Sequence, residues 1–436
     1  MIQHPPRAGD DRLVRAIGPL ALGVNMVNLT VGGGIFVLPG VIAAQLGAAA
    51  ILAYLVCSAA VALVFLCFAE IGSRVTRSGG AYAYIEDAFG PFAGFAAWVL
   101  LWFGWNVLSD AALTVALTDA VATQLPLLVQ PLPRATFMVG LCAGLAWVNV
   151  IGVRTGVRFV LVNTAIKLVP LLLLIAAGLF AVNRDFLTIS KWPDVPSFGA
   201  GALILFFAFA GAESGLNASG EIANPVRTVP RGVALGMSGI LLIYLGLQTV
   251  AQGVLGPELA KNADAPLAAV ARVVLGAWGG GLLFAASVMS IFATLSGDIL
   301  GAPRVVFASA RDGHLPAFLA KVHHRYKTPF ASIVFFAALI AALAISGTFR
   351  FLAVVASGSI LLVYLGVSLS VIRLRRRDGP PPPGSFALPW GHLIPALSCA
   401  VVSWLLIQLT RAEAIGLATL AGVSVLLYAV RTQVRR

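Results

Sequence analysis

Two short segments that contain several glycines interrupt otherwise apolar stretches of the sequence. The first is three consecutive glycines, residues 32–34, and in the second Gly211 and Gly215 flank Glu213. Glycine disfavours a continuous helix, and unpaired backbone at membrane depth is tolerated where it lines a cavity or meets a ligand. The N–H groups that begin a half-helix attract an anion, and freed carbonyl groups attract a cation. A carboxylate and an ammonium held side by side describe an α-amino acid; the alternative role of such glycines is close helix packing.

Several ionisable side chains lie where the surrounding sequence is apolar. They are Glu70, Asp110, Asp119, Lys167, Glu213 and Asp298. A charge at bilayer depth costs ~2.5–3.5 kcal/mol even on the lenient insertion scale, so each of these side chains is a candidate functional group. Lys167 lies near the middle of its apolar stretch, too deep to reach the surface easily.

The composition indicates which elements must carry these groups. Of the 436 residues 59% are hydrophobic and 11% are charged, against roughly 45–50% and 25% in soluble domains. Because a soluble globule cannot bury so many apolar residues, lipid must be the solvent for much of the surface. This excludes a soluble enzyme, a secreted disulfide scaffold and a disordered protein. Twelve apolar stretches predict an all-α membrane protein with twelve transmembrane helices: 17–42, 48–70, 92–124, 135–151, 156–182, 199–221, 232–255, 277–303, 329–346, 350–372, 391–410 and 413–430.

The positively charged residues predict the orientation. With both chain ends placed inside, 21 of the 29 Lys and Arg residues fall in cytoplasmic segments and seven on the opposite side. Short loops rich in Lys and Arg are typically cytoplasmic. We therefore expect a multi-pass protein of the cell (plasma or inner) membrane with cytoplasmic N- and C-termini.

Several partners are not expected. The formal charge of +12 is not arranged as a basic stripe interleaved with aromatic residues, which argues against nucleic acid. The four cysteines lie inside apolar stretches and the five histidines in tails, loops or a span edge, without metal-ligand spacing, so no metal, cofactor or disulfide is predicted. The oligomeric state is not readable from the sequence.

The two interruptions lie five apolar stretches apart, and this spacing predicts an inverted repeat. Because five is odd, the second group of five must enter the membrane from the opposite side. A discontinuous helix at the start of each half is the sequence pointer to a binding site at the midplane. The expected parts are a cytoplasmic tail, two five-helix repeats, a cytoplasmic Arg/Pro-rich loop, two further helices and a second cytoplasmic tail: 1–16, 17–182, 199–372, 373–390, 391–430 and 431–436.

Several motifs resemble those of the amino acid–polyamine–organocation superfamily. They are residues 32–36 (GGGIF) with Pro39, 206–214 (FFAFAGAES) leading into 221–231 (EIANPVRTVPR), 264–268 (DAPLA), and Arg304 followed by 310–316 (ARDGHLP). The similarity covers the first eight stretches, and the last four agree in number alone. It implies a leucine-transporter-type fold, a 5+5 inverted repeat with broken helices 1 and 6. Relatives often have Ser or Thr at the position of Gly33, so here backbone N–H groups must hold the substrate carboxylate.

The resemblance also implies a substrate site. The residues expected to bind substrate are Thr30, Gly32, Gly33, Gly34, Asp110, Phe207, Ala210 and Ser296. The glycine backbone would hold the carboxylate, and the carbonyl groups of Thr30, Phe207 and Ala210 the ammonium. Phe207 matches an aromatic gate, against the simpler interpretation of a lipid- or core-facing ring, and Ser296 would face the substrate side chain. An acid is unusual in this family at the position of Asp110. Asp110 would either contact a substrate amine or pair with Lys167.

Two residues are expected to couple transport to protons. Lys167 matches a lysine of proton-coupled relatives and would replace sodium by donating to carbonyl groups freed in the first stretch and to the hydroxyls of Ser290 and Thr294. A structural lysine paired with an acid such as Asp110 is the alternative. Glu213 resembles an acidic proton sensor, and the alternative is a neutral carboxyl bonded to the broken backbone.

The function that these patterns favour is a secondary active transporter that moves an amino acid by alternating access, coupled to protons. The small and apolar lining favours a neutral amino acid, while Asp110 leaves a cationic one open. A proton-independent exchanger or exporter of amino acids or amines, and a transport-inactive membrane sensor, are the alternatives. A membrane enzyme is not expected, because paired metal-binding acids and an intramembrane His are missing from the sequence.

Overall fold

The computed structural model describes residues 17–75, 80–151, 157–190, 192–213, 222–311, 315–381 and 386–434, with the backbone alone at 157–163, 225–226 and 430–434. Within them the chain is helical and forms no strand; a single parallel bridge joins Ile17 to Ile222. Both expected tails, residues 1–16 and most of 431–436, and the second half of the interruption near Glu213 lie outside the described side chains.

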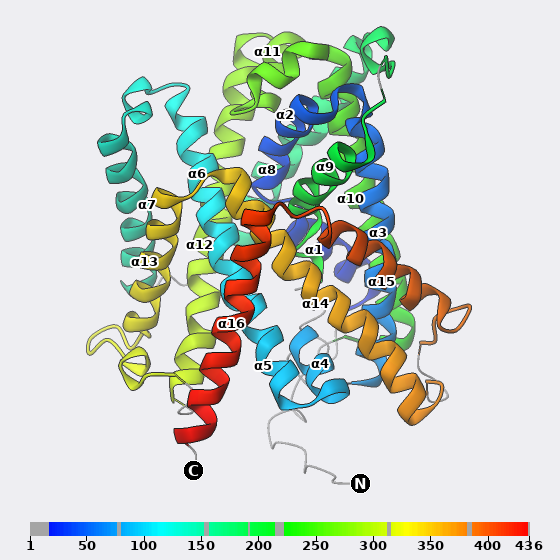
Figure 1. Cartoon of the computed structure of the whole chain (residues 1–436). Coiled ribbons are helices and arrows are strands. Elements are labelled where there is room, and N and C mark those ends of the chain that lie inside the picture. The colour runs from blue at the N-terminus through cyan, green and yellow to red at the C-terminus, as the bar shows by residue number, and fades with distance from the viewer. Residues whose placement is uncertain are drawn as a thin grey trace.

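The helices follow one another along the whole chain (Figure 1). The α-helices are α1 Pro19–Thr30, α2 Gly34–Leu46, α3 Ala50–Arg74, α4 Ala81–Phe89, α5 Pro91–Val99, α6 Leu108–Ala122, α7 Pro131–Ile151, α8 Val157–Gly178, α9 Val195–Phe209, α10 Pro225–Leu255, α11 Pro266–Leu275, α12 Ala277–Arg311, α13 Phe330–Ser346, α14 Phe349–Asp378, α15 Leu393–Leu406 and α16 Arg411–Val434. A π-helix, η3 Leu100–Val107, joins α5 to α6. Short 3₁₀ turns are η2 Gly47–Ala49, η4 Pro126–Val129, η5 Leu179–Ala181, η6 Arg184–Leu187, η9 Gly256–Asn262 and η10 Ala317–Ala320.

Local sequence sets many of the helix ends. Proline stands in the first turn of α1, α9 and α10, where its missing N–H costs nothing. The Asp194 side chain accepts a hydrogen bond from the Ser197 N–H and caps α9. Gly256 and Gly379 follow α10 and α14 with positive φ, a conformation that only glycine adopts without strain.

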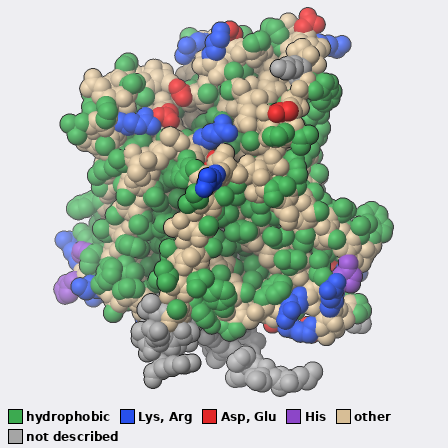
Figure 2. Space-filling model, in the orientation of Figure 1, with side chains coloured by type: hydrophobic (Ala, Val, Ile, Leu, Met, Phe, Trp, Pro, Cys, Tyr) green, Lys and Arg blue, Asp and Glu red, His purple; other side chains and the backbone are tan. Residues whose placement is uncertain are grey.

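Every predicted apolar stretch contains a helix, and eight helical stretches are long and apolar enough to cross a membrane. Large apolar side chains are exposed in mid-helix: Trp147 of α7 exposes 69% of its surface and Leu242 of α10 exposes 72%. Figure 2 shows a largely hydrophobic belt, with most of the charged side chains of this face toward its upper and lower ends. Lipid explains this exposure, so the protein is an integral membrane protein.

Two short amphipathic helices lie outside the predicted stretches. The helix α4 follows the long helix α3, and α11 follows the long helix α10. In Figure 1, α11 lies at the top of the molecule and α4 at the bottom; these are called the α11 end and the α4 end below. The two halves of the chain thus contain a similar order of elements.

The expected loop at 373–390 begins later than predicted. The helix α14 continues to Asp378, so the arginines at 373 and 375–377 lie on its last turns. They stay helical because they have partners there: Arg373 donates to the Ala88 carbonyl, and Arg377 pairs with Asp87 and Asp378.

The broken helices lie in the middle of this bundle. The helix α1 ends at Thr30 and α2 begins at Gly34, so the first interruption falls where the glycines predict it. The helix α9 ends at Phe209, one residue before Ala210. The long helix α10 packs along α1, while α2 packs against α9. The two predicted interruptions are therefore neighbours in space.

Candidate functional site

The first interruption leaves backbone N–H groups free at the start of α2. Gly32 N–H donates to the Thr30 carbonyl at 2.7 Å, and Phe36 N–H donates to the Gly33 carbonyl at 3.2 Å. Among the described residues, no backbone acceptor pairs with the N–H groups of Gly33 and Gly34. These groups lie at the positive end of the α2 dipole, which suits a carboxylate. Gly32, also expected to bind the carboxylate, uses its N–H internally instead.

Packing explains why the segment contains glycine. A Cβ atom at Gly33 would come within 2.7 Å of both Ile291 of α12 and Leu113 of α6. A Cβ atom at Gly34 would come within 3.1 Å of the Phe207 ring, whereas one at Gly32 would have 3.7 Å to the Thr294 hydroxyl. The space that a Ser or Thr side chain fills in relatives is therefore occupied at Gly33 by two apolar side chains.

Phe207 lies over the glycine segment and is part of an aromatic cluster. Its ring centroid lies 5.6 Å from that of Trp105 in η3 and 5.9 Å from that of Phe349 at the start of α14. Phe207 is buried, and its ring lies beside Gly34, at the place that a Cβ atom there would approach. Sequence reasoning identified Phe207 but missed Trp105 and Phe349. The signal for Trp105 is weak, because the chain has eight tryptophans and the π-helix that orients this one is not visible in the residue pattern.

Glu213 organises the second interruption. Its carboxylate accepts a hydrogen bond from the Gly211 N–H at 2.8 Å and from the Tyr364 hydroxyl of α14 at 2.5 Å. Gly211 has φ of 115° and lies against the Leu29 carbonyl of α1, a position that a side chain would strain. Ala210 ends α9, and its N–H donates to the Phe206 carbonyl at 3.3 Å. Glu213 thus bonds to the backbone of the interruption, and these bonds do not decide between a proton sensor and a neutral carboxyl.

Tyr244 of α10 links the two interruptions. Its hydroxyl lies 2.6 Å from the Ala208 carbonyl of α9 and 3.0 Å from the Thr30 carbonyl of α1. A tyrosine hydroxyl carries one proton, so it donates to one of these carbonyls at a time. Tyr244 is completely buried. Sequence reasoning missed it, and a tyrosine within an apolar stretch is its only signal.

Lys167 reaches the end of α1 from α8. Its ammonium donates to the Asn28 carbonyl, one of the last carbonyl groups of α1, which have no partner within the helix. Thr164, one turn earlier on α8, donates to the Asn28 side chain at 2.9 Å. The expected hydroxyl partners do not take part: Thr294 donates to the Ser290 carbonyl, and the Ser290 hydroxyl has no partner in the described part of the chain.

Asp110 is not brought to Lys167. Asp110 is completely buried in the first turn of α6, and both its carboxylate oxygens are without a hydrogen-bond partner among the described residues. The side chain that interacts with it electrostatically is Asp298 of α12. Ser296, also on α12, is half-buried, and no described contact ties it to the glycine segment.

Two other candidate acids have ordinary structural partners. Glu70 is buried at the α4 end, where its carboxylate accepts two hydrogen bonds from Arg375 and one from the Leu388 N–H at 2.9 Å. Asp119 forms an ion pair of 2.6 Å with Arg134, and both side chains are partly exposed. In the described ranges no three His, Cys, Asp or Glu side chains gather as a metal site requires.

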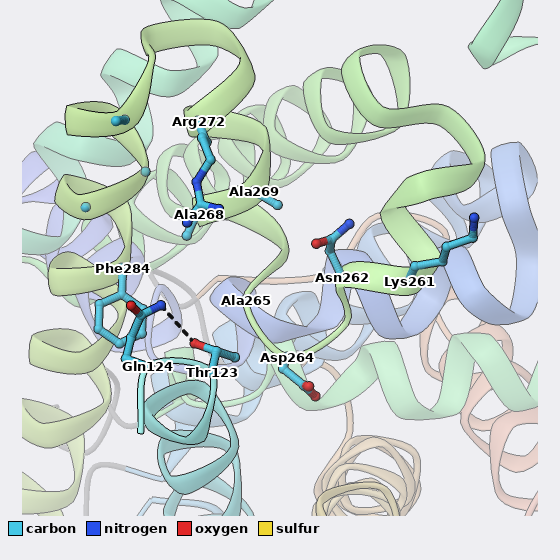
Figure 3. A pocket seen from close by; sticks show the side chains of 13 residues that line it. Thr123, Gln124, Lys261, Asn262, Asp264, Ala265, Ala268, Ala269, Arg272 and Phe284 are labelled. Carbon is cyan, nitrogen blue, oxygen red and sulfur yellow. Dashed lines mark hydrogen bonds between the residues drawn. The ribbon is translucent and has the colours of Figure 1, made fainter. Parts of the chain in front are cut away.

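A cavity of about 480 Å³ opens near the α11 end, apart from the glycine segment. Figure 3 shows Lys261, Asn262, Asp264 and Arg272 around it, with Gln124 and Thr123 on the opposite wall. Side chains of both charges border it. None of the described residues of the two interruptions lines this cavity.

Comparisons with known proteins identify the family of the chain. The family model for amino acid permeases matches residues 17–425. The chain is 27% identical to a methylthioribose transporter of Bacillus subtilis, over 91% of this chain and 89% of the relative. It is 24% identical to the branched-chain amino acid permease BcaP of the same organism, over 92% and 90%. It is 27% identical to the serine/threonine exchanger SteT, also from B. subtilis, over 84% and 85%.

Proposed function

We propose that this chain, which belongs to the amino acid permease family, is a secondary active transporter. It would move an amino acid by alternating access. The observation that carries the proposal is the pair of free N–H groups, Gly33 and Gly34, at the start of α2 and beneath the Phe207 ring. Free N–H groups at a buried helix start need an acceptor from a side chain, water or a ligand, and the carboxylate of a ligand fits both their direction and the helix dipole. Membership of this family supports a transporter rather than an enzyme.

The order of the helices supports an inverted repeat. Each half begins with a helix that ends at an interruption, α1 at Thr30 and α9 at Phe209, and continues with a long helix, a short amphipathic helix and three further long segments. The short helices, α4 and α11, lie at opposite ends of the molecule (Figure 1), as they must if the second half is inverted. We infer twelve spans, in which α1, α2, α3, α9 and α10 move against α6, α7, α8, α12, α13 and α14.

The lining favours a neutral amino acid. Leu113, Ile291 and Phe207 surround the glycine backbone, and apolar walls fit an uncharged substrate side chain. The carbonyls of Thr30, Phe207 and Ala210 remain the proposed ammonium ligands, and Ser296 remains a proposed contact of the substrate side chain. The names of the relatives do not decide the charge of the substrate: methylthioribose, branched-chain amino acids, and serine or threonine carry no net charge, whereas a relative from Arabidopsis thaliana is named a cationic amino acid transporter.

Coupling to protons is proposed through Lys167 and Glu213. Each bonds to the backbone of one broken helix, Lys167 at Asn28 and Glu213 at Gly211. A change of charge on either group would alter the hydrogen bonding of the helix that must rearrange. Protons therefore have a physical route to the equilibrium between the outward and inward states.

In the proposed orientation the α4 end faces the cytoplasm. The membrane is the plasma or inner membrane of the cell, and it carries a proton gradient. The arginines at the end of α14 lie there, and the excess of Lys and Arg in the short loops on this side supports it. Both termini are then cytoplasmic, and the cavity near α11 faces outward.

Uptake into proteoliposomes tests the proposal. A panel of neutral and cationic amino acids is offered with and without an inward proton gradient. We expect gradient-driven uptake of a neutral amino acid that is lost in Lys167→Ala and retained in Lys321→Ala, which removes an exposed lysine. Uptake by the wild type that ignores the gradient would overturn the coupling and leave transport intact. Counterflow at zero gradient would then identify an exchanger, and binding without any flux would identify a sensor.

A further inference from the structure

Besides Lys167 and Glu213, two further ionisable side chains lie inside the membrane, apart from both interruptions. We propose that Asp110 and Asp298 form a carboxyl pair that binds one proton between α6 and α12. The pair is separate from Lys167 and Glu213, and it goes beyond the proposed function because it holds whether or not the chain transports amino acids. Its ligand is the proton itself.

The packing of α6 on α12 brings the two carboxyl groups together. At one end of the contact, Leu113 and Ile291 both touch the position of Gly33. Toward the other end, Trp102 donates its indole N–H to the Ala302 carbonyl at 2.9 Å. Residue numbers fall along one helix as they rise along the other, so the helices run antiparallel. Asp110 and Asp298 both lie between these two contacts.

The direction of the two side chains reduces the remaining distance between the carboxyl groups. From the two contacts, Asp110 is level with a point on α12 about one turn before Asp298, roughly 6 Å along the axis. Every Cα–Cβ bond tilts toward the N-terminus of its own helix. In an antiparallel pair, Asp110 therefore leans toward Asp298 and Asp298 leans toward Asp110. The electrostatic interaction between them agrees with this direction.

Among the described side chains no cation compensates the pair: on α12 itself Arg304 and Arg311 are exposed and lie beyond Ala302, and the side chain of Arg158 on α8 lies outside the described part. On the elements packed against α6 and α12, Arg134 pairs with Asp119, Lys167 donates to Asn28, and Tyr364 donates to Glu213. Arg272 lies in the cavity near α11, and the Cys142 thiol of α7 is the remaining titratable group that interacts with Asp110. The segments η3, η4, η10 and α13 carry no titratable side chain, and on α14 the arginines lie near its two ends.

Electrostatics then require a proton. Asp110 is buried and Asp298 is half-buried, and two carboxylates that face each other at such a site without a counter-ion repel, so one proton removes the repulsion. Loading adds one proton to two carboxylates and gives one carboxylic acid and one carboxylate. Asp110, completely buried and without another partner, is the acid, and its O–H points at the Asp298 carboxylate. The pair thus carries a single negative charge.

The position of the pair relates it to the glycine segment. Leu113 lies one helical turn from Asp110, and together with Ile291 it packs against Gly33. Removing the proton would push α6 and α12 apart beneath the free N–H groups of α2. Protonation of the pair therefore holds this wall of the site together.

Infrared difference spectroscopy of the purified full-length chain tests the pair without measuring transport. We expect a protonated carboxylic C=O band at neutral pH in the wild type. Asp110→Asn removes this band. Asp298→Asn keeps it and moves it to higher frequency, because the acid loses its acceptor. The control Asp119→Asn, which removes an acid paired with Arg134, changes neither its intensity nor its position.

Three results would overturn the proposal. They are a wild type without a protonated carboxylic band, an Asp110→Asn spectrum that keeps every band, and an Asp298→Asn spectrum with the band unmoved. Glu213→Gln identifies any band that belongs to the second interruption. Gel filtration establishes that each variant is folded, and if Asp110→Asn does not fold, the band shift in Asp298→Asn decides alone.

Discussion

At each interruption a charged side chain bonds to a backbone group that has no partner in a helix, and the two charges are opposite. At the first, a cation from another helix, Lys167, meets a carbonyl group at the end of α1. At the second, an anion within the interruption, Glu213, accepts the Gly211 N–H. A broken helix exposes acceptors at one cut and donors at the other, so each kind of cut requires a partner of the opposite character. The comparison shows that these two charged residues at membrane depth form hydrogen bonds with the interrupted backbone.

Removing the anion of the second interruption should have the largest effect. Glu213→Ala leaves two buried donors, the Gly211 N–H and the Tyr364 hydroxyl, without an acceptor, and each unsatisfied group costs about 1–3 kcal/mol. We expect the free energy of unfolding in detergent to fall by roughly 2–6 kcal/mol. Glu213→Gln keeps an acceptor and should lose much less. If both variants lose the same amount, the charge matters more than the hydrogen bonds.

Removing the cation of the first interruption should cost less, because it satisfies a single carbonyl. Lys167→Met should lower the free energy of unfolding by about 1.5–3 kcal/mol, the usual value of a hydrogen bond to a charged group. Chemical unfolding in detergent measures this. Thr164→Val, which removes the bond to the Asn28 side chain, should cost about 1 kcal/mol. A Lys167→Met protein as stable as the wild type would show that the ammonium does not fix the end of α1.

The glycines of the first interruption should differ from one another. Gly33→Ala pushes a methyl group against Leu113 and Ile291, and such overpacking typically costs about 1–3 kcal/mol. Gly32→Ala has room for the same methyl group and should stay within about 1 kcal/mol of the wild type. Unfolding and substrate-induced thermal stabilisation measure both. Equal losses in the two variants would mean that backbone freedom, and not space, selects glycine here.

The bridge between the interruptions should give the smallest change. Tyr244→Phe removes one hydroxyl that bonds one carbonyl at a time and should cost about 0.5–1.5 kcal/mol. Tyr54→Phe is a matched control, because its neighbouring hydroxyl has no partner among the described residues. It should be neutral in the same unfolding assay. If Tyr54→Phe lowered the free energy of unfolding more than Tyr244→Phe, the Tyr244 hydroxyl would not stabilise the contact between the interruptions.

Local chemistry made part of this site predictable. Three consecutive glycines predicted where α1 ends, because helix propensity is a property of the residues themselves. The contact of Lys167 with a freed carbonyl of α1 was also expected, since a buried ammonium needs acceptors and a broken helix supplies them. The protein family followed from short motifs, and the match over residues 17–425 confirms it.

Contacts between distant helices were not predictable in the same way. The partner of Asp110 depends on how α6 is rotated against α12, and apolar residues surround both helices in the sequence. The π-helix before α6 shifts that rotation, and no residue pattern predicts it. Trp105, Tyr244 and Tyr364 were missed for the same reason. In a lipid-facing bundle the hydrophobic pattern no longer marks the inner face.

The hydrogen bond from Gly32 N–H to the Thr30 carbonyl has a consequence for turnover. This carbonyl accepts a hydrogen bond from its own chain, and Tyr244 offers a second donor. If this carbonyl binds the ammonium of a substrate, as proposed, the ammonium must replace bonds that the protein makes to itself, and its affinity is the difference between the two sets. On release of the substrate the chain would recover its own bonds. A carrier of this kind would bind its substrate weakly enough to release it and would return unloaded without an exposed polar backbone.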